Sequence, residues 1–149
     1  MTQTKKSLGS HSFPVFERVV DADPIARWRL RYKYGLLSEV LHHAQSGDTL
    51  LPPRIFLFGS FASGRWNDLS DVDLIYVWRN ALARDRFWDR RLPLELWLVR
   101  HGFDRRVDVI DSILTNSRSR AVASLRAHGD AIVYLPAALA EARRRLAAN

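Results

Sequence analysis

The chain has 149 residues, a formal net charge of +7 and no cysteine. This length suits one domain with a core of its own, and an apolar content of 47% excludes an intrinsically disordered chain. Disulfides and thiolate metal sites are excluded as well. We find no signal-peptide pattern and no membrane-spanning stretch, which predicts a cytoplasmic protein. The positive charge favours polyanionic partners without choosing among nucleotides, nucleic acid and acidic proteins.

Helix and strand signals alternate along the chain. We expect a flexible tail over residues 1–13 and one domain over residues 14–149, since no repeat or internal linker divides it. The first helix is predicted from Asp23 and Pro24, which suit an N-cap and a first turn, to Gly47. Its core-facing stripe is predicted from apolar spacings of three and four residues: Ile25, Trp28, Tyr32, Leu36 and Val40.

Strands are predicted over residues 54–58, 71–78, 106–110 and 131–135, where short apolar or alternating runs are bounded by turn residues. A turn and a short helix are expected at Gly59 and Ser60. Further helices are predicted from Pro93 to Gly102, over residues 117–128, and from Pro136 onward. This order indicates an α/β (α+β) fold in which helices flank a mixed sheet.

Three aspartates lie on these predicted strands. Side chains alternate along a strand, so Asp71 and Asp73 project from one face while Val72 and Leu74 project from the other. Asp108 lies opposite its valine neighbours in the same way, and it reaches the same place if the two strands are adjacent. Carboxylates gathered without a counter-charge repel one another, so a cation between them is expected. Three oxygen donors without cysteine or suitably spaced histidine select Mg²⁺ or Mn²⁺.

A glycine-serine pair ends the strand that precedes the first two aspartates. Gly59 lets a phosphate approach closely, and Ser60 adds a hydroxyl to the backbone N–H donors. Such a site suits in-line displacement at the α-phosphorus of a nucleoside triphosphate, with release of pyrophosphate. We assign Asp71 and Asp73 to metal binding, and Asp108 to the catalytic metal and the acceptor's proton.

Gly59-Ser60, ten intervening residues and then Asp71-Val72-Asp73 resemble the signature of the DNA polymerase beta-like nucleotidyltransferase superfamily. Val107-Asp108-Val109 resembles the strand that carries its third carboxylate. The resemblance covers about residues 54–135, and its compact spacing is most similar to that of the minimal nucleotidyltransferases. It implies the fold of that superfamily, a magnesium-dependent reaction and ATP as the donor substrate.

Members of that group are often antitoxins encoded beside a HEPN-type ribonuclease toxin, and some transfer AMP to the toxin. The resemblance therefore implies such a toxin as the protein partner and acceptor, in a hetero-oligomer. Family members commonly carry an arginine where this chain has Ser63. We expect Arg65 to replace that arginine in binding the triphosphate.

Other readings stay open from the sequence. The serine at Ser63 favours a catalytically weak antitoxin that acts by binding alone, and the arginine-rich surface favours an RNA-directed nucleotidyltransferase. Phe61 and Trp66 either line a nucleobase pocket or anchor their loop. Asp111 follows Asp108 by three residues and so faces the other side of the strand, where we expect it to cap the next segment.

Overall fold

A mixed four-stranded sheet forms the centre of the fold. The computed structural model describes residues 24–46 and 52–148, so the tail predicted over residues 1–13 and the helix ends predicted at Asp23 and Gly47 lie outside the described residues. The strands have the order β4-β3-β2-β5. Their bounds are Arg54–Phe58 for β2, Val72–Trp78 for β3, Val107–Ile113 for β4 and Ile132–Tyr134 for β5. The predicted mixed sheet flanked by helices is confirmed.

The pairing directions fix which residues share an edge of the sheet. β3 runs parallel to β4, whereas β2 runs antiparallel to both β3 and β5. The starts of β3 and β4 therefore lie at the same end of the sheet as the end of β2. This arrangement brings the predicted glycine-serine turn and the predicted aspartates to one edge.

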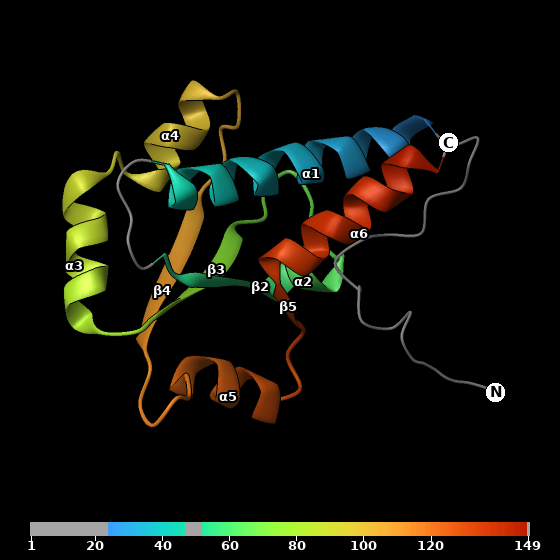
Figure 1. The fold of residues 1–149 in the computed structure, drawn as a ribbon. Coiled ribbons are helices and arrows are strands. Elements are labelled where there is room, and N and C mark those ends of the chain that lie inside the picture. Colours follow the sequence, from blue (N-terminus) through green and yellow to red (C-terminus); the bar gives the residue numbers. More distant parts are fainter. Residues whose placement is uncertain (1–23, 47–51, 149) are drawn as a thin grey trace.

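Helices cover the two faces of the sheet unequally (Figure 1). α1 and α6 pack together on one face, α3 and α4 lie beside β4, and α5 covers part of the opposite face. The helices of the described residues are α1 (Pro24–Gln45), α2 (Gly59–Ser63), α3 (Ala81–Arg90), α4 (Leu94–Arg100), α5 (Arg120–Ala127) and α6 (Leu135–Ala147). No helix among these residues is long and apolar enough to cross a membrane.

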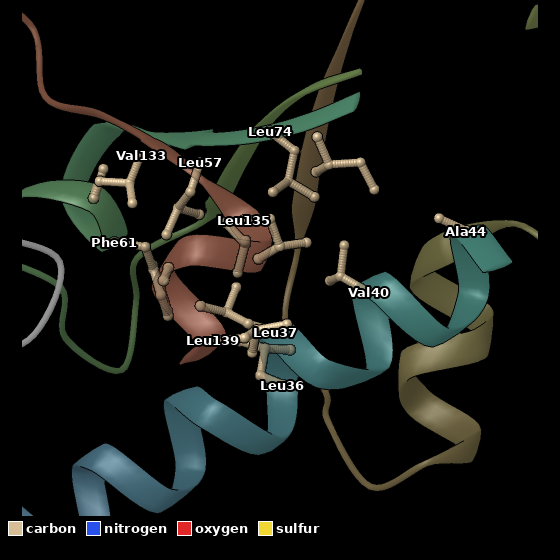
Figure 2. Close-up of a cluster of buried hydrophobic side chains, with 14 of the residues drawn as sticks. Leu36, Leu37, Val40, Ala44, Leu57, Phe61, Leu74, Val133, Leu135 and Leu139 are labelled. Carbon is tan, nitrogen blue, oxygen red and sulfur yellow. The ribbon is translucent and has the colours of Figure 1, made fainter. Parts of the chain in front are cut away.

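The main core lies between the sheet and the pair α1 and α6. Figure 2 shows Leu57, Leu74 and Val133 pointing from three strands toward apolar side chains of the two helices. Leu36, Leu37 and Leu135 at this interface have no solvent exposure. Burial of this apolar surface holds β3 in place, and β3 positions the aspartates at its start.

The core stripe predicted for α1 is wrong in its first half. Ile25 is 70% exposed and Trp28 is 58% exposed, and the buried face begins instead with Leu30 and Lys33. Lys33 is fully buried with its ammonium 5.3 Å from the ring centroids of both Phe61 and Trp66. A buried lysine in cation–π contact with two rings therefore lies where apolar spacing placed none, and the buried face is rotated from the predicted one.

Several element bounds also differ from the predicted ones. β4 extends to Ile113 and not to residue 110, because it pairs with β3 along the whole length of that strand. α5 begins at Arg120 and not at residue 117, since the Ser119 hydroxyl caps it by accepting from the Val122 N–H at 3.2 Å. α3 lies between the strand predicted to end at residue 78 and the helix predicted from Pro93, and it is capped by Asn80, whose side chain accepts from the Ala83 N–H.

Candidate active site

The strand register brings the three predicted aspartates to one face of the sheet. Asp73 on β3 is the direct partner of Asp108 on β4, so their side chains project from the same face. Asp71 lies two residues before Asp73 and shares that face, whereas Val72 and Leu74 are fully buried on the other. The adjacency of the two strands, on which the expected convergence depends, is therefore present in the fold.

The aspartates occupy the uncovered end of their face. Toward the far end of β3, the same face is apolar and packs on α5 through Ile75, Val77 and Val122. Near the start of β3, the side chains of Asp71 and Asp108 are 40% and 48% exposed. The sheet thus presents a solvent-accessible acidic patch beside a helix-covered apolar region.

Gly59 contacts this acidic patch directly. Its backbone has φ of +71°, in the left-handed region that favours glycine. A Cβ atom added at Gly59 would lie 2.3 Å from Oδ2 of Asp73 and 3.3 Å from its Cβ. The turn after β2 and the Asp73 carboxylate therefore fit together only when residue 59 has no side chain.

Charge repulsion and partial burial act on Asp73. Burial raises the pKa of its carboxyl group above the ordinary value of 3.8, and the nearby charges of Asp108 and then Asp71 raise this pKa further. Arg106, within the described part of the chain, forms ion pairs with this patch. Its Nε lies 3.6 Å from Oδ1 of Asp108 and 3.8 Å from Oδ2 of Asp71, in an exposed position.

The chemistry of the three carboxylates fits a hard divalent cation. They supply oxygen donors, and the pKa of Asp73 is raised first by burial and then by the charges of Asp108 and Asp71, a repulsion that a cation would relieve. In the part of the chain that the structure describes, no three acidic, histidine or cysteine groups are already gathered at metal-ligand distances. Binding of a cation by all three carboxylates would therefore require these side chains to move closer together and to leave their ion pairs with Arg106.

The loop after Gly59 is anchored by its aromatic residues and by hydrogen bonds within its own turn. Phe61 and Trp66 are buried and stacked, with ring centroids 4.9 Å apart, so in this structure they anchor the loop and do not line an open nucleobase pocket. The Ser63 hydroxyl donates to the Ser60 carbonyl at 3.2 Å, and the backbone N–H of Arg65 donates to the same oxygen at 3.0 Å. The Arg65 side chain is exposed.

Asp111 faces away from the three aspartates, as predicted, but the capping role expected for it is wrong. Its carboxylate accepts hydrogen bonds from the indole N–H groups of Trp78 at 2.7 Å and of Trp88 at 3.1 Å. The parallel register with β3 extends through Asp111, so it stands within a strand and not at a helix start.

Two arginines near the site were not singled out from the sequence. Arg105 donates from Nη1 to the carbonyl oxygens of Asn67 and Ser70, both at 2.8 Å, and so holds the loop that leads into Asp71. Arg106 precedes Asp108 by two residues, and strand alternation alone places both on one face. Alternation could therefore have identified Arg106 from the sequence, whereas no local pattern indicates the long-range contacts of Arg105.

Comparisons with known proteins agree with this geometry. Residues 52–133, more than half of the chain, match the family model described as "Polymerase beta, Nucleotidyltransferase". The chain therefore belongs to the polymerase beta nucleotidyltransferase family, and the match includes Gly59, Ser60 and all three aspartates. A search of curated proteins finds no significant match.

One solved structure resembles part of the chain. It is a crystal structure of a protein from Sulfolobus solfataricus, provisionally titled a nucleotidyltransferase. The sequence identity is 20%, the TM-score is 0.33, and the alignment covers 62% of this chain and 79% of the other. The family assignment rests on the sequence match and not on this partial likeness.

Proposed function

We propose that this protein transfers a nucleoside monophosphate, AMP from ATP, to a hydroxyl group of a partner protein in a reaction that depends on Mg²⁺ or Mn²⁺. The observation that supports the proposal most strongly is the pairing of Asp73 with Asp108, with Asp71 on the same face and Gly59 in contact with Asp73. The family assignment supports a nucleoside triphosphate as the donor.

Each site residue has a role in this proposal. Asp71, Asp73 and Asp108 would hold the divalent cation, which when bound supplies neutralisation of the triphosphate charge. Gly59 and Ser60 form the turn against which the phosphates lie. Arg65 is exposed at the end of that turn, where its guanidinium is free to reach the triphosphate.

The proposed group transfer changes no oxidation state, so it needs no oxidant or reductant. The acceptor oxygen forms a bond to the α-phosphorus as the bond between that phosphorus and the bridging oxygen of the β-phosphate breaks, and pyrophosphate leaves. The hydroxyl proton passes to a carboxylate oxygen of Asp108. Orientation of the two reactants and stabilisation of charge account for the rate enhancement.

The identity of the acceptor protein is a second and more specific part of the proposal. The compact spacing of the site resembles the minimal nucleotidyltransferases, so we propose a HEPN-type toxin as the acceptor, bound in a hetero-oligomer. An antitoxin that acts by binding alone is the second candidate. The observation favouring it is that Ser63, at the position of the usual arginine, points its hydroxyl at the Ser60 carbonyl.

Transfer of radioactive label tests the enzymatic proposal. The protein is incubated with α-³²P-labelled ATP, Mg²⁺ and the protein encoded beside it, and label on the neighbour is measured. Asp71→Asn and Asp73→Asn should each lower transfer about 100-fold or more, because each removes a cation ligand. Asp111→Asn is the matched control, since Asp111 lies on the same sheet but faces the other side.

The same samples separate the two candidate functions. Neutralisation and binding of the partner that persist in Asp71→Asn, with no label transferred by the wild-type protein, would establish the binding-only antitoxin. Label transferred equally by wild type and by the Asp73→Asn variant would contradict the assigned site.

A further inference from the structure

β4 is an edge strand with open backbone groups. In the described sheet it pairs only with β3. Arg106 O accepts from Val72 N, and Leu114 N donates to Trp78 O, so the even-numbered residues of this segment bond to β3. The N–H and C=O groups of the odd-numbered residues therefore point outward: Val107, Val109, Asp111 and Ile113. One of these outward groups already has a partner, because the N–H of Val107 donates to Oε2 of Glu95 at 2.9 Å.

A pocket of about 260 Å³ lies beside this edge, on the face opposite the three aspartates. Its lining combines apolar side chains with one basic and one acidic residue: Trp88, Arg91, Pro93, Leu94, Glu95, Val107 and Val109. This volume is below the range typical of cofactor or drug-sized sites, and it suits a single apolar side chain. Trp88 is fixed in the wall because it stacks on Tyr76 and donates to Asp111.

Consecutive residues of β4 face the pocket and the acidic patch in turn. Val107 and Val109 line the pocket, and Asp108 between them projects from the other face. A strand laid along β4 would alternate its own side chains in the same way. One of its residues would enter the pocket, and the next would stand beside Asp108 with Cβ atoms about 5 Å apart.

We propose that an extended segment of the acceptor protein adds to β4 as a further strand, with an apolar side chain in this pocket and an adjacent serine, threonine or tyrosine beside Asp108. This inference rests on the proposed transferase function and names how its acceptor is recognised. Backbone hydrogen bonds to β4 supply affinity, and the pocket fixes which hydroxyl residue reaches the carboxylates.

Charge near the pocket does not select the sign of the residues that flank the anchor. Arg86 and Arg90 are exposed on the second half of α3, and Arg91 follows in the pocket wall. The carboxylates of Asp89, of Glu95 in the same wall and of Asp111 bonded to Trp88 offset these three cations. The segment is therefore specified by its apolar anchor and by the adjacent hydroxyl residue.

Peptide libraries test the spacing. Eight-residue peptides carry a fixed central serine or tyrosine and mixed residues elsewhere, and two readouts are taken: labelling from α-³²P-labelled ATP, and retention on the immobilised protein. The proposal predicts apolar residues enriched about tenfold or more at one position adjacent to the hydroxyl residue, and not two positions away. Val109→Phe, which fills the pocket, should abolish this enrichment, whereas the control Val99→Phe on the exposed face of α4 should keep it.

Backbone methylation of a selected peptide tests strand addition with the wild-type protein, and so does not depend on how the variants fold. N-methylation should weaken binding about three- to tenfold at every second position, where the peptide N–H faces β4, and have little effect at the positions between. Equal sensitivity at all positions, or no enrichment in either readout, would overturn the inference.

The two readouts also separate this inference from the proposed function. Enrichment by retention without any labelling supports strand addition and counts against the transferase. Labelling without selection at the adjacent position supports the transferase and overturns strand addition. If β4 instead pairs with β4 of a second copy, the protein sediments as a dimer that the peptides do not dissociate, and the inference is again overturned.

Discussion

Gly59 joins two constraints in one residue, a left-handed backbone and contact with a carboxylate. Gly59→Ala should lose about 1–2 kcal/mol of stability from its φ of +71° alone. The added Cβ would also displace the Asp73 carboxylate, so affinity for Mn²⁺ should fall about tenfold or more. Thermal unfolding and Mn²⁺ titration measure the two effects.

Gly129 supplies the matched control for that substitution. Its φ is +79°, and an added Cβ would meet nothing within 4 Å. Gly129→Ala should therefore lose similar stability with no change in Mn²⁺ affinity. Equal Mn²⁺ affinity in both variants would show that the contact between Gly59 and Asp73 does not position the carboxylate.

The raised pKa of Asp73 predicts a pH-dependent destabilisation. Because its pKa is higher in the folded state than in the unfolded state, ionised Asp73 destabilises the fold at pH values above the folded pKa. That destabilisation disappears as the pH falls below the unfolded value. In metal-free buffer at pH 7, Asp73→Asn should raise Tm by roughly 2–4 °C.

The difference in Tm between wild type and Asp73→Asn should become smaller as the pH is lowered toward 4, because wild-type Asp73 is then increasingly protonated. Calorimetry across this pH range measures the two Tm values. A variant that unfolds at a lower temperature than wild type at every pH would contradict the assigned cause of the shift.

At the scale of the elements, the loop before β3 is held by Arg105. Its guanidinium donates to the carbonyl oxygens of Asn67 and Ser70 and lies 5.6 Å from the ring centroid of Trp66. Arg105→Met keeps the apolar stem and removes these hydrogen bonds, so amide exchange at Ser70 should accelerate about tenfold. Hydrogen exchange measures this loss, with the exposed Arg126→Met as control, and unchanged protection at Ser70 would contradict the role of Arg105.

Sequence patterns located the strands that carry the site because their signals are local. The apolar run before Gly59 and the alternation around Asp73 and Asp108 each depend on neighbouring residues, and the strands follow within a few positions. Strand alternation indicates which face of a strand a side chain lies on, but it does not indicate which strand lies next to it. From the sequence, the meeting of Asp108 with Asp73 therefore depended on β3 and β4 being adjacent.

The parts that the sequence did not predict depend on contacts far apart in the chain. Lys33 is buried with its ammonium near the rings of Phe61 and Trp66, contacts that no spacing within α1 indicates. Asp111 was expected to cap the segment that follows it, yet it accepts from two indoles contributed by β3 and α3. Such pairings are set by tertiary packing and override local propensity.

At the scale of the whole molecule, the two faces of the sheet differ: one contributes most of the core, and the other carries the candidate site. One face packs on α1 and α6 and contributes most of the buried apolar surface. The other carries the acidic patch, in which the pKa of Asp73 is raised, at an edge where β4 pairs with no further described strand. The net charge of +7 of the whole chain favours polyanionic partners over neutral protein surfaces.

Titration of Mn²⁺ in the presence of ATP tests the central claim most directly, because it requires neither an acceptor nor a partner. We predict one saturable set of sites in the wild-type protein, weakened about tenfold or more in each of Asp71→Asn, Asp73→Asn and Asp108→Asn, and unchanged in Asp111→Asn. Mn²⁺ binding that is the same in all four variants as in the wild type would contradict the claim that these three aspartates form a cation site.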